Sequence, residues 1–411
     1  MKAVIISVGT ELLFGQTTDT NAVYLSQQLQ LLGIDVMYRH TVGDNPARFR
    51  QMLDLSYQDC DLVITTGGLG PTQDDLTKEI VTEALDDRLV LHAPSLEKIE
   101  GFFRQMKRPM TENNKKQAYM PSKAVILENA QGTAPGFALE SGGRTAICLP
   151  GPPREMTAMF VSGVRPYLET RTESAMYYKM LRTFGIGESA LETVLQDLID
   201  GQTDPTLATY AKEGECSLRI ASKRPARAEA EQAVAEMLAK VKVRVGEFIY
   251  SEDDTDLATV AGRKLIESGI SISCAESCTG GLFAAGLTGI PGISTVFGRG
   301  FVTYSNASKT EELGVSAEIL ERHGAVSEET ALAMARGLQK RSGSRIAISV
   351  TGIAGPEGGT PEKPVGLAYI GCIFDGKEVC KRVMSRNVNR NWNRNHTVLS
   401  MFAVIRGLIE A

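Results

Sequence analysis

Two long stretches of this chain alternate between strand-like and helix-like patterns, and this alternation is the feature that most restricts the fold. In the first stretch, apolar runs typical of buried strands cover residues 3–8, 35–39 and 61–66. Between them, residues 21–32 and 46–57 carry apolar side chains near helical spacing. Strands that alternate with helices predict a parallel sheet covered on both faces, whose ligands bind beyond the carboxyl ends of the strands.

The alternation returns in the last part of the chain, after a smaller section of a different kind. In that middle section, residues 207–212 and 216–222 read as paired strands around a turn, and residues 226–241 read as a helix. The last part then predicts helices and strands at 257–268, 270–274, 281–287, 295–304, 316–322, 328–341, 345–350 and 365–373, followed by a terminal helix. We therefore predict an α/β protein with two layered α/β domains joined by a small α+β domain, with bounds 1–170, 171–250 and 251–411.

Composition restricts the class of protein. The 411 residues are 43% hydrophobic and 23% charged, which is ordinary for a globular chain, and no apolar run approaches the length of a membrane span. The net charge of -5 argues against a general nucleic-acid binder. Seven cysteines without a Cys-x-x-Cys pair fit free thiols in a reducing compartment. We expect a cytoplasmic protein that binds neither membrane nor nucleic acid.

A turn of small residues, Ser277–Gly281, carries the strongest chemical signal. It follows the strand-like run 270–274 and opens a helix-like segment, so Ser277 sits where a strand turns into a helix. Glycines let backbone N–H groups approach a substrate closely, and a helix N-terminus favours an anion. A serine there can act as a nucleophile if a base is at hand, and Tyr304 and Lys309 are candidate proton carriers.

Three other interpretations of this turn stay open. Ser277 can be a plain helix N-cap. Cys278, beside it at the helix start, is a rival nucleophile because its pKa could fall there. The four histidines lie in no triad-type local motif, which favours a Ser–Lys–Tyr arrangement, but His323 or His396 can still reach the serine in space.

Polar loops follow three strands of the first stretch: Gly9–Glu11, Gly43–Asn45 and Gly67–Asp75. Because the carboxyl ends of parallel strands share one edge, these loops predict a phosphate or nucleotide site. Asp44, together with Asp74 or Asp75, is a candidate for holding a divalent metal, since hard cations prefer carboxylate oxygens. The alternative is a capped helix start with Asp in its first turn. The candidate nucleotide-site residues are Gly9, Thr10, Glu11, Gly67, Gly68, Gly70, Thr72 and Asp74.

Across essentially its whole length the chain resembles the CinA family of competence/damage-inducible proteins. The segments that resemble its N-terminal domain, a relative of molybdopterin-binding proteins, are 9–11, 66–75, 132–136 and 149–153. The segments that resemble its C-terminal nicotinamide mononucleotide amidase domain are 277–281, 300–306, Lys309, 323–327, 351–356 and 363–366. The middle section resembles the KH-type connecting domain of the family.

This resemblance implies that the last domain hydrolyses the carboxamide of nicotinamide mononucleotide to the carboxylate, releasing ammonia without a cofactor. Ser277 matches the nucleophile, and Lys309 and Tyr304 match its proton-transfer partners. An amide also needs an oxyanion hole, for which the backbone N–H groups of Thr279, Gly280 and Gly281 are our candidates. Thr351 and Gly352 are candidates for binding the substrate amide or phosphate.

The tail departs from the family pattern, which carries Gly-Asp-Arg and a second arginine four residues on. Here Gly-Asp is replaced, while Arg390 and Arg394 keep the spacing. An arginine pair can grip a phosphate bidentately, and the alternative is a solvated helix start.

For the first domain the resemblance implies a metal-dependent ADP-ribose pyrophosphatase, with Asp44 and Asp75 holding the divalent metal. Two alternatives remain, a pterin binder and a nucleotide-binding regulatory protein without turnover. The middle section has no Gly-x-x-Gly loop of the RNA-binding kind, so we expect it to connect and dimerise the chain as a homodimer.

Overall fold

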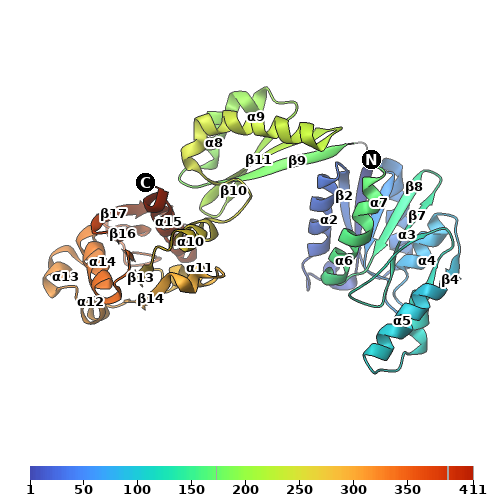
Figure 1. Ribbon diagram of the computed structural model, residues 1–411, viewed down its shortest axis with the longest axis horizontal. Helices are drawn as coiled ribbons and strands as arrows, with labels where there is room; N and C mark the ends of the chain where they lie inside the picture. Colours follow the sequence, from blue (N-terminus) through green and yellow to red (C-terminus); the bar gives the residue numbers. More distant parts are fainter. Residues whose placement is uncertain (173, 387, 411) are drawn as a thin grey trace. The chain divides into compact units, whose positions relative to one another are not determined.

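The computed structural model describes residues 1–172, 174–386 and 388–410 (Figure 1). Its internal contacts form two compact units, Met1–Tyr177 with Ser222–Gln232, and Tyr178–Ala221 with Ala233–Ala411. The predicted class, α/β layers with a small α+β domain, is confirmed. Ala411, the predicted end of the third domain, lies outside the described residues.

The first unit contains a six-stranded sheet in the order β2-β1-β3-β8-β7-β6. Strands β1 (Lys2–Val8), β2 (Asp35–Val42), β3 (Leu62–Thr66) and β8 (Arg144–Leu149) are parallel. The prediction of a parallel sheet is wrong at the other edge. There β7 (Gly136–Ser141) pairs antiparallel with β8, and β6 (Val125–Leu127) pairs antiparallel with β7. The reason is a two-residue connection, Gly142-Gly143 with φ of 57° and 79°, which is too short for anything but a hairpin.

Helices cover both faces of this sheet. One face packs on α2 (Thr20–Leu31), α6 (Pro153–Met159) and α7 (Arg165–Glu169), through Leu25, Leu29 and Phe160. The other packs on α3 (Pro46–Asp59) and α4 (Thr77–Ala84). The parallel strands therefore end together at one edge. The remaining elements of this part are α1 (Thr10–Leu13), β4 (Leu89–Leu91), α5 (Ala93–Gln105), a 3-10 helix (Glu112–Ala118), β5 (Tyr119–Pro121) and a π-helical turn (Phe160–Val164).

The middle section folds as a four-stranded sheet in the order β10-β11-β9-β12. The predicted strand pair is confirmed: β10 (Thr206–Lys212) and β11 (Glu215–Arg224) are antiparallel, with Lys212 opposite Glu215 across the turn. The other elements are β9 (Ala175–Thr183), α8 (Glu188–Asp200), α9 (Arg227–Val245), a 3-10 turn (Gly246–Phe248) and β12 (Ile249–Ser251).

The C-terminal domain is built on a five-stranded sheet in the order β14-β13-β15-β16-β17. Strands β13 (Ile272–Glu276), β14 (Phe297–Val302) and β15 (Ile346–Gly352) are parallel, and β16 (Leu367–Phe374) and β17 (Lys377–Met384) are antiparallel additions. The sequence analysis missed β17, because most of its residues are exposed and it lacks an apolar run. The Asp375-Gly376 turn before it, with both φ positive, is a typical hairpin signal.

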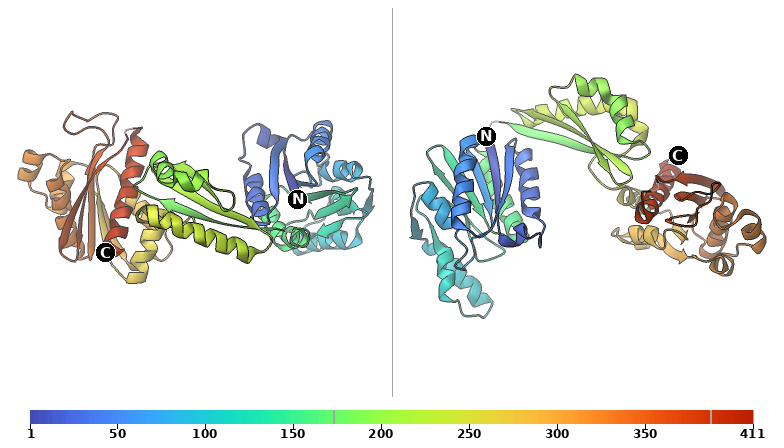
Figure 2. Two further views of the ribbon diagram at one scale, coloured as in Figure 1. Left: turned by 90° about the horizontal axis from the view of Figure 1, so that it is seen from above. Right: turned by 180° about the vertical axis from the view of Figure 1, so that it is seen from behind.

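Helices cover both faces of the five-stranded sheet as well (Figure 2). In the left view, the red α15 (Arg390–Glu410) and the yellow α10 (Leu257–Ser268) lie on one side of the sheet, with α11 (Leu282–Thr288) packed against both. The orange α12 (Asn306–Leu313), α13 (Ala317–His323) and α14 (Glu328–Ser342) lie on the other side, and a 3-10 turn, Ile293–Thr295, precedes β14. Among the described residues, none of the helices is both long enough and apolar enough to cross a membrane.

Two helical glycines provide a matched test of this packing. A Cβ on Gly337, in α14, would lie 1.7 Å from the Leu313 carbonyl oxygen, whereas a Cβ on Gly407, in α15, would meet no atom within 4 Å. We expect Gly337→Ala to lower the free energy of unfolding by about 3 kcal/mol, the upper part of the usual cost of overpacking. Gly407→Ala should instead raise it by roughly 0.5–1 kcal/mol. Urea unfolding of the two variants checks this, and equal stability would contradict the close packing of α12 on α14.

Candidate functional site

Ser277 is almost buried in the turn between β13 and α11, at the carboxyl end of the central strands. Its backbone N–H donates to the Val350 oxygen at 3.1 Å, and its own carbonyl accepts from Gly280 at 3.1 Å. Gly280 and Gly281 have φ of 60° and 94°, so the turn needs residues without a Cβ. These contacts hold the Ser277 hydroxyl in one place.

Lys309 is brought directly to this hydroxyl. It lies on α12 and is 1% exposed, and its Nζ donates to Ser277 Oγ at 3.1 Å. The same nitrogen donates to the Thr303 oxygen at 2.9 Å and the Tyr304 oxygen at 3.4 Å. Burial lowers the pKa of Lys309, which favours the neutral amine. A neutral amine at this distance can accept the serine proton, so the arrangement fits nucleophilic catalysis.

The Tyr304 side chain does not join this pair. It is 60% exposed, and its hydroxyl accepts a hydrogen bond from Arg390 Nη2 at 2.8 Å. Within the described chain, no hydrogen bond links the Tyr304 hydroxyl to Ser277 or Lys309. Tyr304 therefore contributes its backbone carbonyl to Lys309 and its hydroxyl to the Arg390 side of the site.

The structure argues against the three other interpretations of the turn: a Ser277 N-cap, a Cys278 nucleophile and a histidine base. The N-cap of α11 is Gly281, so Ser277 is not that cap. Burial raises the pKa of Cys278 to about 12, the opposite of the shift that an attacking thiolate needs. His323 contacts Glu329 at 3.1 Å and His396 contacts Ser385 at 3.0 Å, and neither hydrogen-bonds to Ser277 in the described structure.

The sequence analysis missed Glu276, whose carboxylate anchors the turn. Its side chain is fully buried and accepts three backbone N–H groups, from Gly281 at 3.0 Å, Phe283 at 3.1 Å and Ala284 at 2.9 Å. The only sequence signal is an acid at the end of an apolar strand, directly before the glycine turn. The proposal of Gly280 and Gly281 as oxyanion donors needs correction, because Gly281 N–H already donates to Glu276 and Gly280 N–H to Ser277. Thr279 is the one of the three candidates without such an engagement in the described residues.

Four predicted residues remain. Arg390 and Arg394 reach the site, whereas the Thr351 hydroxyl is used elsewhere and Gly352 has no side chain to offer. The Thr351 hydroxyl donates to the Ala325 oxygen at 2.6 Å, and a Cβ on Gly352 would lie 2.7 Å from Ala368 Cβ. On α15, Arg394 Nη2 donates to the Thr279 oxygen at 2.9 Å, and Arg390 holds the Tyr304 hydroxyl and the Gly355 oxygen.

Several buried polar atoms around the turn have no partner in the described structure. They are the hydroxyls of Thr279 and Thr303 and the Nε of Arg394. Buried donors and acceptors are normally paired, so the turn carries polar capacity that the described side chains do not use.

Three family models match consecutive parts of the chain. Residues 254–409 match a family described as "CinA C-terminal domain", residues 178–251 one described as "Damage-inducible protein CinA KH domain", and residues 4–170 one described as "Probable molybdopterin binding domain". A CinA-like protein from Dictyoglomus turgidum is 47% identical over 412 residues, covering 100% of each chain. The chain belongs to the CinA family.

Two further proteins are similar to this chain. A CinA-like protein from Kosmotoga olearia is 47% identical over 98% of this chain and 97% of its own. The crystal structure of competence/damage inducible protein CihA from Agrobacterium tumefaciens is 42% identical, covers 38% of this chain and 96% of that chain, and has a TM-score of 0.36.

In the N-terminal domain of this CinA-family chain, the predicted polar loops lie at the carboxyl edge of the parallel strands. Asp44 ties the first two loops together, since its Oδ2 accepts from Thr10 N at 3.0 Å and Thr10 Oγ1 at 2.7 Å. Gly67 and Gly68 begin the third loop with φ of 103° and 67°. Of the other predicted positions, Gly9 precedes α1, Gly70 lies against the Asp75 carboxylate, and Glu11, Thr72 and Asp74 are exposed.

Lys116, which the sequence analysis missed, holds the third loop from the 3-10 helix Glu112–Ala118. Its Nζ donates to the Thr72 oxygen at 3.0 Å and the Asp75 oxygen at 2.5 Å. Asp75 Oδ2 in turn accepts from Thr72 N at 2.9 Å. Lys116 thereby fixes the conformation of the third loop through two of its backbone carbonyls.

Two observations bear on the expected divalent metal site at Asp44 and Asp75. Strand β1 lies between β2 and β3, so the loops that carry Asp44 and Asp75 are not direct neighbours at the sheet edge but lie on either side of the loop that follows β1. Among the described residues, no group of three or more His, Cys, Asp or Glu side chains could hold a metal ion. Two carboxylates still fit the donor set of a divalent ion that takes its other ligands from substrate phosphates and water.

Proposed function

We propose that the C-terminal domain hydrolyses the carboxamide of nicotinamide mononucleotide to nicotinate mononucleotide and ammonia. The observation that carries the proposal is the buried Lys309 amine, 3.1 Å from the Ser277 hydroxyl, at a strand-to-helix turn. Family membership supports it, since the matched C-terminal segment contains both residues.

In this mechanism Ser277 Oγ attacks the carboxamide carbon and its proton passes to the neutral Lys309 amine. The carbonyl oxygen becomes an oxyanion, for which the Thr279 N–H is the donor left by the corrected assignment. The proton on Lys309 then passes to the leaving nitrogen, the C–N bond breaks and ammonia departs. Water adds to the ester, and Ser277 recovers its proton as nicotinate mononucleotide leaves.

Arg390 and Arg394 suit the mononucleotide phosphate in this proposal. Both guanidinium groups lie at the edge of the site, and guanidinium forks match phosphate oxygens. The Tyr304 hydroxyl, held by Arg390, then borders the ribose phosphate and not the reacting carbonyl.

Ammonia release tests the proposal directly. The purified protein should release ammonia from nicotinamide mononucleotide and much less from nicotinamide riboside or nicotinamide, because those controls lack the phosphate or the whole ribose phosphate. Absence of ammonia from the mononucleotide, with folded protein, would reject the amidase. Equal turnover of all three would keep an amidase but reject the phosphate role of the arginines.

We further propose that the N-terminal domain binds a diphosphate nucleotide and, with a divalent ion, hydrolyses ADP-ribose. The third loop supports this, because Lys116 and two positive-φ glycines hold its backbone in a form suited to an anion. Asp44 and Asp75 would hold the ion, which would neutralise charge on the pyrophosphate.

Chelation separates this activity from its rivals. We expect EDTA to abolish AMP release from ADP-ribose and added Mg²⁺ or Mn²⁺ to restore it. Asp75→Asn should lower that turnover by roughly 100-fold, because it removes a metal ligand. Asp59→Asn, at the C-terminal end of α3, should not change it. Turnover that survives EDTA rejects the metal, and no turnover with either ion favours a pterin binder or a regulatory domain.

A further inference from the structure

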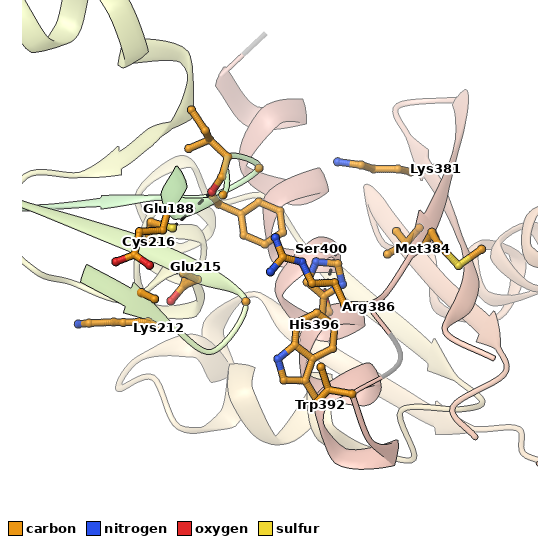
Figure 3. Close-up of a pocket in the computed structure, with 18 of the residues that line it drawn as sticks. Glu188, Lys212, Glu215, Cys216, Lys381, Met384, Arg386, Trp392, His396 and Ser400 are labelled. Atoms are coloured by element: carbon orange, nitrogen blue, oxygen red, sulfur yellow. Dashed lines mark hydrogen bonds between the residues drawn. The ribbon is translucent and has the colours of Figure 1, made fainter. Parts of the chain in front are cut away.

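A cavity of about 490 Å³ lies within the second compact unit and takes no part in the proposed amidase chemistry. Its walls come from residues 184–188, from 211, 212 and 214–216 around the β10–β11 turn, from 381–384, 386 and 388, and from the face of α15 that carries Trp392 and His396 (Figure 3). Its volume falls in the range of small-molecule sites.

Well-packed residues support this cavity. Tyr250 of β12 is buried in the core of the C-terminal domain, and Phe184 packs against the same core. Arg406 of α15 also donates to the Ile249 oxygen at 3.1 Å. The walls are therefore continuous with the core of the unit.

An aromatic surface forms one side of the cavity. The Trp392 and His396 rings are stacked, with centroids 5.0 Å apart and planes 10° from parallel, and Phe184 lies 6.1 Å from His396. Ser385 Oγ contacts His396 Nδ1 at 3.0 Å and fixes that ring. Nucleobases and other planar rings stack on surfaces of this kind.

Two cations line the cavity without side-chain partners among the described residues, Arg386 beside the aromatic side chains and Lys381 farther along β17. Across the described residues, the side chains of Arg386 and Lys381 make neither a hydrogen bond nor an ion pair. The acids on the opposite wall differ from each other. Glu215 is matched by Arg182 at 3.5 Å and by the Tyr250 hydroxyl at 2.6 Å, while Glu188 is exposed at the start of α8. In Figure 3, Arg386 lies beside His396 and Trp392, and Glu188 and Glu215 come from the facing strands and helix.

We propose that this cavity is a second nucleotide site, which binds a mononucleotide by its ring and its phosphate. The ring stacks at Trp392, the phosphate pairs with Arg386 and Lys381, and Glu188 is placed to accept ribose hydroxyls. The site is separate from the Ser277 turn, but α15 serves both, because Arg390 and Arg394 flank Trp392 in sequence. The proposal goes beyond the amidase and does not depend on it.

Tryptophan fluorescence tests the site in the full chain, because Trp392 is the chain's only tryptophan. Titration with AMP should give a saturable change, while adenosine and inorganic phosphate, each lacking one half of the ligand, should bind at least about tenfold more weakly. Arg386→Met should weaken AMP by at least about tenfold, the cost of a lost charge-assisted contact. Lys377→Met, which removes an exposed cation of β17 outside the cavity, should leave AMP binding unchanged.

Calorimetric titration of the same proteins gives a second readout. Saturable binding that is lost in Arg386→Met and kept in Lys377→Met supports the proposal. AMP binding that survives Arg386→Met and is displaced by nicotinate mononucleotide would place AMP in the Ser277 site and overturn it. No saturable signal by either method would overturn it as well. None of these outcomes uses ammonia release, so failure here leaves the amidase proposal untouched.

Discussion

Lys309→Met is expected to lower kcat for ammonia release from nicotinamide mononucleotide by at least about 100-fold, the usual scale for losing a general base. The Lys309 amine is the only group that hydrogen-bonds to Ser277 Oγ among the described residues, so no second base stands ready. Met has a similar length and no proton acceptor. Steady-state ammonia release, compared with Ser277→Ala as the matched loss of the nucleophile, measures the effect.

The pH dependence of this pair has a definite sign. Burial lowers the pKa of Lys309 in the folded protein, and only the neutral amine can take the serine proton. Activity should therefore rise with pH through that lowered pKa. The unfolded chain binds more protons than the folded one between the lowered pKa and the ordinary lysine value of about 10.4, so the free energy of unfolding also rises with pH across that window.

Lys309→Met should abolish that pH-dependent part of stability. The variant should gain most, relative to the wild type, below the lowered pKa, where the buried amine must be charged. The gain in the free energy of unfolding should shrink as the pH approaches about 10.4, the pKa of an unperturbed lysine. Unfolding curves at several pH values provide the measurement. Cys278→Ala is the control and should keep most activity, because its thiol has a pKa raised to about 12. A folded but inactive Cys278→Ala, beside an active Ser277→Ala, would overturn the assignment.

The layered domains could be predicted from the sequence because their central strands are buried on both faces. Runs such as 3–8 and 61–66 are mostly apolar and contain consecutive buried β-branched residues, a pattern that can be recognised without knowing the strand's partners. Edge strands gave no such signal. Strand β17 is mostly exposed and follows a two-residue turn. Its only sequence signal is therefore the turn dipeptide Asp375-Gly376. The reversal at β7 depends in the same way on Gly142-Gly143.

The site shows a similar division. Ser277 and Lys309 carry chemistry that their residue types reveal, so both could be proposed before the structure brought them to 3.1 Å. Glu276 and Lys116 act on backbone groups, whose positions depend on how the loops fold. The residue type of Tyr304 and the family resemblance place it with Ser277 and Lys309, but in the structure its hydroxyl contacts Arg390.

Glu276 gives the second large expected effect. Its carboxylate lies on the strand side of the turn and accepts N–H groups from Gly281, Phe283 and Ala284. Glu276→Ala would leave these donors without an acceptor at a fully buried position. Since each unsatisfied buried donor costs about 1–3 kcal/mol, we expect the free energy of unfolding to fall by at least about 3 kcal/mol.

The catalytic effect of Glu276 should appear in kcat more than in KM, because the carboxylate holds the turn and touches no substrate group in the proposed reaction. We expect Glu276→Gln, whose amide oxygen keeps part of the acceptor set, to retain more stability and more kcat than Glu276→Ala. Glu267→Gln, at the exposed end of α10, is the matched control and should behave as the wild type. Kinetics well below the unfolding temperature separate a misplaced Ser277 from simple unfolding. If Glu276→Ala keeps both its unfolding midpoint and its kcat, the three hydrogen bonds do not position the catalytic turn.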